Sequence, residues 1–211
     1  MSFNIIIRII ISYIRRFFLH RNSDLKADIE LFDGDDILFK SILLNNTKVY
    51  AEYGCGASTE WVAKNTTTKI YSVDTSSEWV KKIQKINIAN DIEYIDCGPV
   101  GDWGTPMNYS KRDNFISYTD WIWRQKFSPD TVLIDGRFRV CCFLTCLKYA
   151  KEGTQIIFDD YFARPNYHIV EEFLKKSDSN TRQCVFEVPN KLELNLDKIN
   201  YEIERFRYVL D

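Results

Sequence analysis

Short apolar runs that alternate with helix-forming segments constrain the fold of this chain more than any other feature. Runs of strand length recur at 48–54, 69–74, 92–98, 131–136 and 154–160. Segments with helical spacing of apolar residues accompany them, at 35–46, 58–65, 76–90, 139–153 and 166–176. Strands that alternate with helices form a parallel sheet covered on both faces. We therefore expect a doubly wound α/β domain.

The last part of the chain extends the predicted sheet. Two further strand-like runs, at 182–188 and 201–210, are joined by a polar loop with no helix between them. Strands that follow one another without a crossover helix pair antiparallel. The predicted fold is a mostly parallel seven-stranded sheet with an antiparallel hairpin at one edge.

Composition narrows the classes of function. The 211 residues suit one domain, and the formal net charge of -2 provides no general basic field for nucleic acid. The 6 cysteines contain no C-x-x-C pair and lie in apolar runs. A zinc site or a disulfide framework is therefore disfavoured, and we expect reduced, buried thiols in a cytoplasmic protein.

Residues 1–20 form a unit separate from the domain predicted over 21–211. They are strongly apolar, but Arg8, Arg15 and Arg16 interrupt them, and the longest uncharged run is too short to span a bilayer. On a helix they would form an amphipathic surface with a basic stripe. Two interpretations remain open: an anchor at the inner membrane surface, or a helix docked on its own domain or on a second subunit of a homo-oligomer.

An acidic residue lies at or just beyond the end of each central strand-like run. In a doubly wound sheet, ligands bind at the carboxyl ends of the strands, where the strand order reverses. One acid at such a position means little, but a series from successive strands indicates a ligand site. The acids are Glu52, Asp74, Asp96, Asp135, Asp159 and Asp160.

The stretch AEYGCGAST at 51–59 indicates the kind of ligand. Gly54 and Gly56 form a turn that lets a ligand approach the backbone, and Glu52 lies two residues before Gly54. A phosphate beside that carboxylate would be disfavoured by about 4 kcal/mol at about 4 Å in an effective dielectric of about 20. S-adenosylmethionine carries an adenosine without a phosphate, and its ammonium would be attracted instead. Asp74, about 20 residues further on, suits a carboxylate that accepts both ribose hydroxyls.

These motifs carry a resemblance to a family. EYGCGAST, followed by YSVD, IDCG, LIDG and IIFDD, resembles class I S-adenosylmethionine-dependent methyltransferases over roughly residues 35–211. The resemblance implies a Rossmann-like seven-stranded sheet with an antiparallel last strand. It implies that Glu52, Gly54 and Gly56 form the loop that binds the methionine part, and that Asp74 binds the ribose.

Four further residues complete the predicted cofactor site. The resemblance implies that Asp96 or Cys97 lies near the adenine. Ser58 stands where many members of the family have a third glycine, and a small residue there still permits close packing. Ser58 and Thr59 are also suitable caps for the helix that begins after the turn.

The stretches LIDGRFR and FDDYFARPNYH carry the candidate chemistry. Metal-dependent O-methyltransferases of the caffeoyl-CoA type hold a divalent ion with an aspartate after the fourth strand and an Asp-Asn pair after the fifth. Asp135 and Asp159 are similar in position, and Asp160 replaces the asparagine. Three carboxylates would suit Mg²⁺ or Ca²⁺, and such a divalent ion lowers the pKa of an acceptor hydroxyl. The alternative is that the aspartates only cap the strand ends.

Without a metal, a general base must take the proton from the acceptor. His168 is one of 2 histidines and has a suitable ordinary pKa, and the aspartates after the fifth strand could serve instead. Arg137, Arg139 and Arg164 flank the same region. They could hold an acidic acceptor by bidentate hydrogen bonds or simply pair with the aspartates. The catalytic candidates are Asp135, Asp159, His168 and Arg137.

The acceptor is expected to be a hydroxyl of a sugar, a glycan or a small metabolite. Trp103 and Tyr109 lie in a loop between the third and fourth strands, and aromatic faces suit a sugar or a planar ring. IDGRFR, FDDY and RPNYH are also similar to methyltransferases associated with polysaccharide genes. Two alternatives remain: a non-catalytic protein that uses this fold for assembly or membrane recruitment, and an NAD-binding Rossmann protein.

Overall fold

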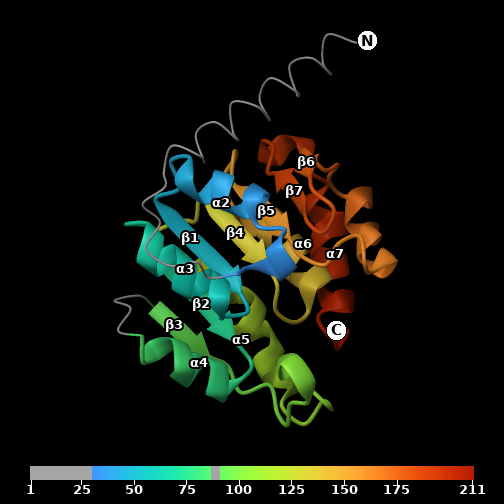
Figure 1. The fold of residues 1–211 in the computed structure, drawn as a ribbon. Helices are drawn as coiled ribbons and strands as arrows, with labels where there is room; N and C mark the ends of the chain where they lie inside the picture. The colour runs from blue at the N-terminus through green and yellow to red at the C-terminus, as the bar shows by residue number, and fades with distance from the viewer. Residues whose placement is uncertain (1–29, 87–90) are drawn as a thin grey trace.

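The protein is built on one seven-stranded sheet with the strand order β3-β2-β1-β4-β5-β7-β6 (Figure 1). The structure is a computed structural model that describes residues 30–86 and 91–211, so the helix predicted over residues 1–20 lies outside it. The strands are β1 (Val49–Tyr53), β2 (Lys69–Asp74), β3 (Asp91–Tyr94), β4 (Thr131–Ile134), β5 (Gln155–Phe158), β6 (Asp178–Ser179) and β7 (Cys184–Glu187).

Strands β1 to β5 run parallel, while β7 lies antiparallel to β5 and β6 antiparallel to β7. The chain winds outward from β1 to β3 and then returns to β4 on the other side of β1. The strand order therefore reverses between β1 and β4, which is the place where open α/β sheets bind ligands. The predicted mostly parallel sheet with an antiparallel edge is confirmed.

Helices cover both faces of the sheet (Figure 1). The α-helices are α2 (Ile37–Leu44), α3 (Ala57–Asn65), α4 (Ser77–Gln84), α5 (Phe115–Asp120), α6 (Arg139–Tyr149) and α7 (Leu196–Phe206). Short 3₁₀ helices are η1 (Phe32–Gly34), η2 (Asp102–Gly104), η3 (Arg112–Asn114), η4 (Trp121–Arg124), η5 (Pro165–Glu172) and η6 (Lys191–Glu193).

The central strands are buried on both sides, which explains why they appear as continuous apolar runs in the sequence. On β4, Val132 and Ile134 pack into the core formed with α5, α6 and α7. Leu133 points to the opposite face and packs with Trp61 of α3 and Phe39 of α2. Because both faces are covered, the side chains at the strand ends are the ones left to form a site.

The prediction of a strand at 201–210 is wrong, because most of this stretch belongs to α7. Ile199 and Ile203 are buried against α6, whereas Tyr201 between them is exposed. Buried residues four positions apart follow the period of a helix. The strand that pairs with β7 on its outer side is instead β6, which precedes it in the chain.

Two helix predictions differ in detail from the structure. The segment predicted as a helix over 166–176 is the 3₁₀ helix η5, which ends at Glu172. The helix predicted to reach Gly153 ends at Tyr149, because Ala150 takes up an extended backbone.

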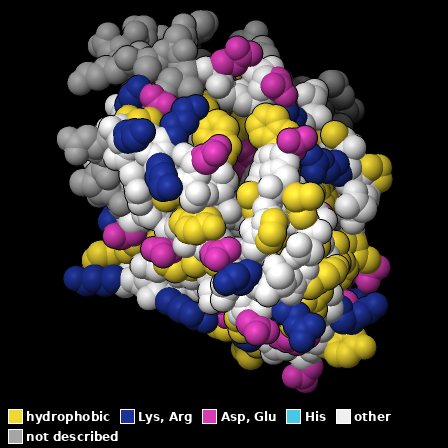
Figure 2. All heavy atoms as spheres, turned by 90° about the horizontal axis from the view of Figure 1, so that it is seen from below, with side chains coloured by type: hydrophobic (Ala, Val, Ile, Leu, Met, Phe, Trp, Pro, Cys, Tyr) yellow, Lys and Arg dark blue, Asp and Glu magenta, His cyan; other side chains and the backbone are white. Residues whose placement is uncertain are grey.

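Two broader findings concern the described residues. All six cysteines are buried and carry free thiols. Within 30–86 and 91–211, none of the helices has the length and apolar character needed to cross a bilayer. On the face seen in Figure 2, basic and acidic side chains are interspersed among apolar ones.

Candidate functional site

A cavity of about 540 Å³ lies at the carboxyl ends of β1, β2 and β4. It brings together the glycine turn after β1, Asp74 at the end of β2, and the segment Asp135–Arg137 after β4. Leu31–Asp33, Trp79, Trp103, Asp160, Arg164 and Arg182 complete much of its wall. The point of strand-order reversal is therefore hollow and lined by several of the residues predicted from the sequence.

The two glycines of the turn are required for different reasons. Gly54 has a φ of +95°, and a Cβ on it would lie 2.9 Å from the backbone of Gly136, so the turns after β1 and β4 touch. Gly136 packs as tightly, because its Cβ would lie 2.2 Å from the Tyr118 hydroxyl oxygen. A Cβ on Gly56 would meet no described atom within 4 Å. Gly54 thus serves close packing, and Gly56 leaves space for a ligand.

Glu52 lies beneath the turn and is fully buried. Its carboxylate accepts hydrogen bonds from the hydroxyls of Tyr50 (2.7 Å), Ser58 (2.8 Å) and Thr59. Burial raises the pKa of Glu52 to about 7, although these hydrogen bonds oppose the rise. The structure shows Glu52 bracing the turn from below. It does not show the carboxylate facing the cavity, where the predicted attraction for an ammonium would act.

Ser58 and Thr59 connect the turn to α3. The Thr59 hydroxyl accepts a hydrogen bond of 2.8 Å from the backbone N–H of Gly56, which is the N-cap of α3. The predicted capping function is therefore present, but it acts within the first turn of the helix. Ser58 also lines the cavity, whereas Thr59 is fully buried.

Asp74 is 8% exposed and faces the cavity. Its two carboxylate oxygens accept backbone N–H bonds from Cys55 (2.8 Å) and Ser76 (2.6 Å). Burial raises the pKa of Asp74, and these two hydrogen bonds oppose that effect. The carboxylate therefore ties the glycine turn to the start of α4 and still presents its remaining lone pairs to a ligand.

Asp96 and Cys97, which were predicted to lie near the adenine, are not among the described residues that line this cavity. Asp96 accepts a hydrogen bond of 3.0 Å from the N–H of Gly98, and Cys97 is fully buried in the core. Two tryptophans, Trp79 and Trp103, line the cavity instead. In the sequence, Trp79 has no signal beyond its place in a predicted helix, whereas Trp103 is visible as an aromatic residue in a loop.

Trp103 has an unusual conformation for a large side chain. It is 80% exposed and has a positive φ of 56°. The loop that carries it is fixed to the end of β2 by a hydrogen bond of 2.6 Å from the Thr75 hydroxyl to the carbonyl of Gly104. A large apolar side chain held exposed beside a cavity is a candidate ligand contact.

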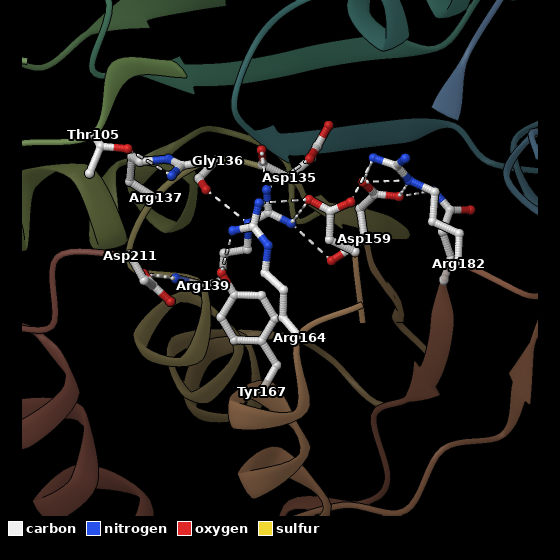
Figure 3. Close-up of polar contacts among 12 residues, drawn as sticks. Thr105, Asp135, Gly136, Arg137, Arg139, Asp159, Arg164, Tyr167, Arg182 and Asp211 are labelled. Atoms are coloured by element: carbon white, nitrogen blue, oxygen red, sulfur yellow. Dashed lines mark hydrogen bonds and ion pairs between the residues drawn. The ribbon is translucent and has the colours of Figure 1, made fainter. Parts of the chain in front are cut away.

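Three aspartates and three arginines form a cluster at the ends of β4 and β5 (Figure 3). We call this set the Asp–Arg cluster; its members are Asp135, Asp159, Asp160, Arg139, Arg164 and Arg182. Asp159 is fully buried, and its carboxylate receives hydrogen bonds from Arg182 (2.7 Å) and from the side-chain amide of Gln183 (2.8 Å).

The other members of the cluster are also paired. Arg139 lies 3.1 Å from Asp135 and 3.4 Å from Asp160. Arg164 and Arg182 approach Asp160 to 3.2 and 2.7 Å. Each carboxylate of the cluster therefore has at least one guanidinium partner.

This pairing bears on the predicted metal site. Asp135, Asp159 and Asp160 each have one carboxylate oxygen that lies within 4.8 Å of the other two, which is close enough for one cation. However, the three arginines already balance the three negative charges, and a divalent ion would have to displace them. The residues present do not fit Mg²⁺ well, and we derive no step that depends on a metal.

Asp135 is the member of the cluster best placed for chemistry. Its side chain is 33% exposed and lines the cavity. Loss of hydration and the neighbouring Asp159 carboxylate raise the pKa of Asp135, while Arg139 opposes the rise. A carboxylate with a raised pKa that faces a cavity is suited to accept a proton.

His168 is not brought to the cavity. Its ring stacks on that of Tyr161 with the centroids 4.6 Å apart, and Nε2 lies 3.1 Å from the carbonyl oxygen of Tyr161. His168 is exposed and is not among the residues that line the cavity, so we assign it no catalytic part.

The arginines flanking the mouth divide into two kinds. Arg139 and Arg164 pair with aspartates, which was one of the two predicted alternatives. Arg137 lines the cavity, and among the described residues its guanidinium hydrogen-bonds only to the Thr105 hydroxyl, at 3.0 Å. Arg182 and Asp33, which pair with each other at the cavity wall, carried no local signal in the sequence because they are far apart in the chain.

Comparison with known proteins adds to this geometry. No family model and no curated protein sequence matches the chain. Among solved structures it is similar to a methyltransferase-like protein from Silicibacter pomeroyi DSS-3, with 30% identity, 79% of this chain and 90% of that chain covered, and a TM-score of 0.69.

A second solved structure has the same fold at low identity. It is a candidate caffeoyl-CoA O-methyltransferase from Staphylococcus aureus, with 10% identity, 83% of this chain and 99% of that chain covered, and a TM-score of 0.53. At that level of identity the likeness concerns the fold alone.

Proposed function

The chain belongs to the class I S-adenosylmethionine-dependent methyltransferase family, and from this premise we propose that it transfers a methyl group to a hydroxyl oxygen of a sugar, a glycan or a small metabolite. The observation that carries the proposal is that the glycine turn, Asp74 and Asp135 line one cavity. The residues that would bind the cofactor and the candidate base therefore lie around one cavity, where a cofactor and an acceptor could bind together.

The residues present fit S-adenosylmethionine. A cavity of about 540 Å³ is of the size that takes cofactors and small molecules. Each oxygen of Asp74 accepts one backbone N–H and can accept one ribose hydroxyl as well. Gly56 leaves room beside the turn, and Trp79 offers an aromatic face to an adenine.

Asp135 is the base in this proposal. When bound, S-adenosylmethionine supplies an electrophilic methyl group on its sulfonium. On transfer, the methyl–sulfur bond would break as the acceptor oxygen bonds to the methyl carbon, S-adenosylhomocysteine would leave, and the proton of the acceptor hydroxyl would pass to the carboxylate of Asp135. The raised pKa of Asp135 makes it a stronger base than an ordinary aspartate. Arg139, 3.1 Å away, keeps the carboxylate in place.

A sugar-like acceptor agrees with the wall of the cavity. Trp103 stands exposed at its edge, and aromatic faces pack well against sugar rings. The surrounding charges are mixed, so hydroxyl groups would find both donors and acceptors. These features support a hydroxylated acceptor and leave its identity to experiment.

The first test is calorimetric titration with S-adenosylmethionine, with NAD as the control, each in the presence of Mg²⁺ and of EDTA. We expect S-adenosylmethionine to bind and NAD not to bind, with the same affinity in EDTA because arginines neutralise the aspartates. Binding of NAD alone, or of neither compound, would contradict the proposal. A requirement for Mg²⁺ would restore the metal hypothesis.

The second test follows transfer of a labelled methyl group to a panel of sugars and small hydroxyl compounds. Asp135→Asn should lower kcat by about 10²–10⁴-fold while the affinity for S-adenosylhomocysteine changes little. Label recovered on nitrogen or sulfur would refute O-methylation. An unchanged kcat would remove Asp135 as the base.

A further inference from the structure

Arg137 differs from every other arginine of the cavity wall in what it binds. Arg139, Arg164 and Arg182 each lie within 3.4 Å of at least one aspartate. Arg137 takes part in no ion pair in the described part of the chain, and its guanidinium makes one hydrogen bond, of 3.0 Å, to the Thr105 hydroxyl. In Figure 3 it points toward Thr105, on the other side of the Asp–Arg cluster from Arg182.

Burial makes this isolation unusual. Arg137 is 7% exposed, and its Nε is buried without a hydrogen-bond partner among the described residues. Removing a charge from water is costly unless a counter-charge and hydrogen bonds replace the lost hydration. Asp74 and Asp211 both feel the positive charge of Arg137, but both lie beyond ion-pair distance. Asp74 already accepts two backbone N–H groups, and Asp211 accepts the N–H of Arg139.

The backbone holds Arg137 in this position. Its N–H donates to the Tyr118 hydroxyl at 3.1 Å, and the preceding Gly136 packs against the glycine turn. The Cys142 thiol donates to the Arg137 carbonyl at 3.3 Å. A planar guanidinium fixed at the wall of a cavity, with unused donors, is prepared for a carboxylate or a phosphate.

We propose that Arg137 is the anion-binding residue of the cavity and that it takes a carboxylate or phosphate group of a bound ligand. This inference rests on the proposed function, because the cavity is taken to be the cofactor and acceptor site. The anion has two sources: the carboxylate of the cofactor, or an anionic group on the acceptor. The second source would make the acceptor an acidic hydroxyl compound, such as a uronate or a sugar phosphate.

The test compares the full-length protein with Arg137→Gln by calorimetry. The ligands are S-adenosylhomocysteine, 5′-methylthioadenosine, which lacks the carboxylate, and inorganic phosphate added to the S-adenosylhomocysteine complex. Arg205→Gln is the matched control, because it removes the same charge from an exposed pair with Glu202 on α7. It should behave as the wild type.

Two results would support the proposal and identify the source. If the cofactor supplies the anion, Arg137→Gln should weaken the binding of S-adenosylhomocysteine by about tenfold to hundredfold and leave the binding of 5′-methylthioadenosine unchanged. If the acceptor supplies it, both should bind normally, and the binding of phosphate to the complex should be lost.

Two other results would overturn it. Equal binding of all three ligands by the variant and the wild type would show that Arg137 meets no anion. Equal weakening of both nucleosides would show that Arg137 only supports the cavity.

The wild type alone provides a check in case the variant does not fold. Phosphate should compete with S-adenosylhomocysteine but not with 5′-methylthioadenosine if the cofactor carboxylate is the anion. It should bind to both complexes if the acceptor supplies the anion. No effect of phosphate on either would count against the proposal. Failure of the wild type to bind either nucleoside would instead refute the proposed function, and the phosphate titration of the free protein would still report on Arg137.

Discussion

Asp74 shows how one side chain can both build a site and serve it. Its oxygens hold the N–H groups of Cys55 and Ser76, so it joins the glycine turn after β1 to the start of α4. The same carboxylate faces the cavity. A substitution here should therefore be conservative in shape, so that loss of binding can be separated from loss of structure.

Asp74→Asn should weaken the binding of S-adenosylmethionine by about tenfold to hundredfold, because the amide nitrogen cannot accept a hydrogen bond from a ribose hydroxyl. Calorimetry and thermal unfolding of the same samples would separate binding from stability. Asp96→Asn is the matched control, since Asp96 lies outside the cavity lining. If Asp96→Asn were the more damaging change, the adenine position expected from the sequence would be correct after all.

The raised pKa of Glu52 leads us to expect that the stability of the protein depends on pH. Its pKa is about 7 in the folded protein against an ordinary value of 4.5, so the folded state holds the proton more tightly than the unfolded chain. The resulting stabilisation is fully present below about pH 4.5 and is lost as the pH rises through about 7. The difference corresponds to about 3 kcal/mol.

Glu52→Gln is neutral at every pH and should lack this loss. Its stability relative to the wild type should improve by about 2–3 kcal/mol between pH 5 and pH 8, measured by urea unfolding. A constant difference between the two proteins at both pH values would show that Glu52 does not titrate in this range.

Among the structural elements, the end of β5 depends most on partners that are distant in the chain. Asp159 follows β5 and is fully buried, and Arg182, just before β7, neutralises it. Arg182 also reaches Asp33 of η1, so one guanidinium connects three segments at the cavity wall.

Arg182→Ala should lower the free energy of unfolding by about 3 kcal/mol, because it leaves a buried carboxylate without its counter-charge. Arg205→Ala removes a comparable side chain from an exposed pair on α7 and should cost less than about 1 kcal/mol. Denaturant unfolding of both variants measures the contrast. Similar costs for the two would mean that solvent replaces Arg182 at Asp159.

At the scale of the whole described domain, the cavity is the place where segments from distant parts of the chain meet. Its wall is made from segments between Leu31 and Arg182, which come from both sides of the reversal in strand order. A ligand in it touches elements that would separate on unfolding. Binding should therefore stabilise the whole domain.

At one hundred times its dissociation constant, S-adenosylhomocysteine should add about 2.7 kcal/mol to the stability. For a domain of this size that corresponds to a rise in Tm of about 5–10 °C. NAD at the same concentration is the control and should produce no shift. An unchanged Tm with S-adenosylhomocysteine under these conditions would mean that the cavity is not its site.

The sequence by itself determined the α/β class, the central strands and the acidic residues at their ends. These depend on local patterns, since a strand buried on both faces must be apolar along its length. The glycine turn was also visible, because backbone with positive φ favours glycine, as at Gly54. For the stretch at 201–210 the local pattern was misleading, since burial against α6 selected the helix.

Only the tertiary structure decided which side chains meet. It placed Glu52 beneath the turn, brought Trp79 and Trp103 to the cavity wall, and left His168 outside it. It also distinguished the arginines, because pairing depends on segments that are far apart in the chain. No local spacing could show that Arg182 would neutralise Asp159 while the Nε of Arg137 would be left without a partner among the described residues.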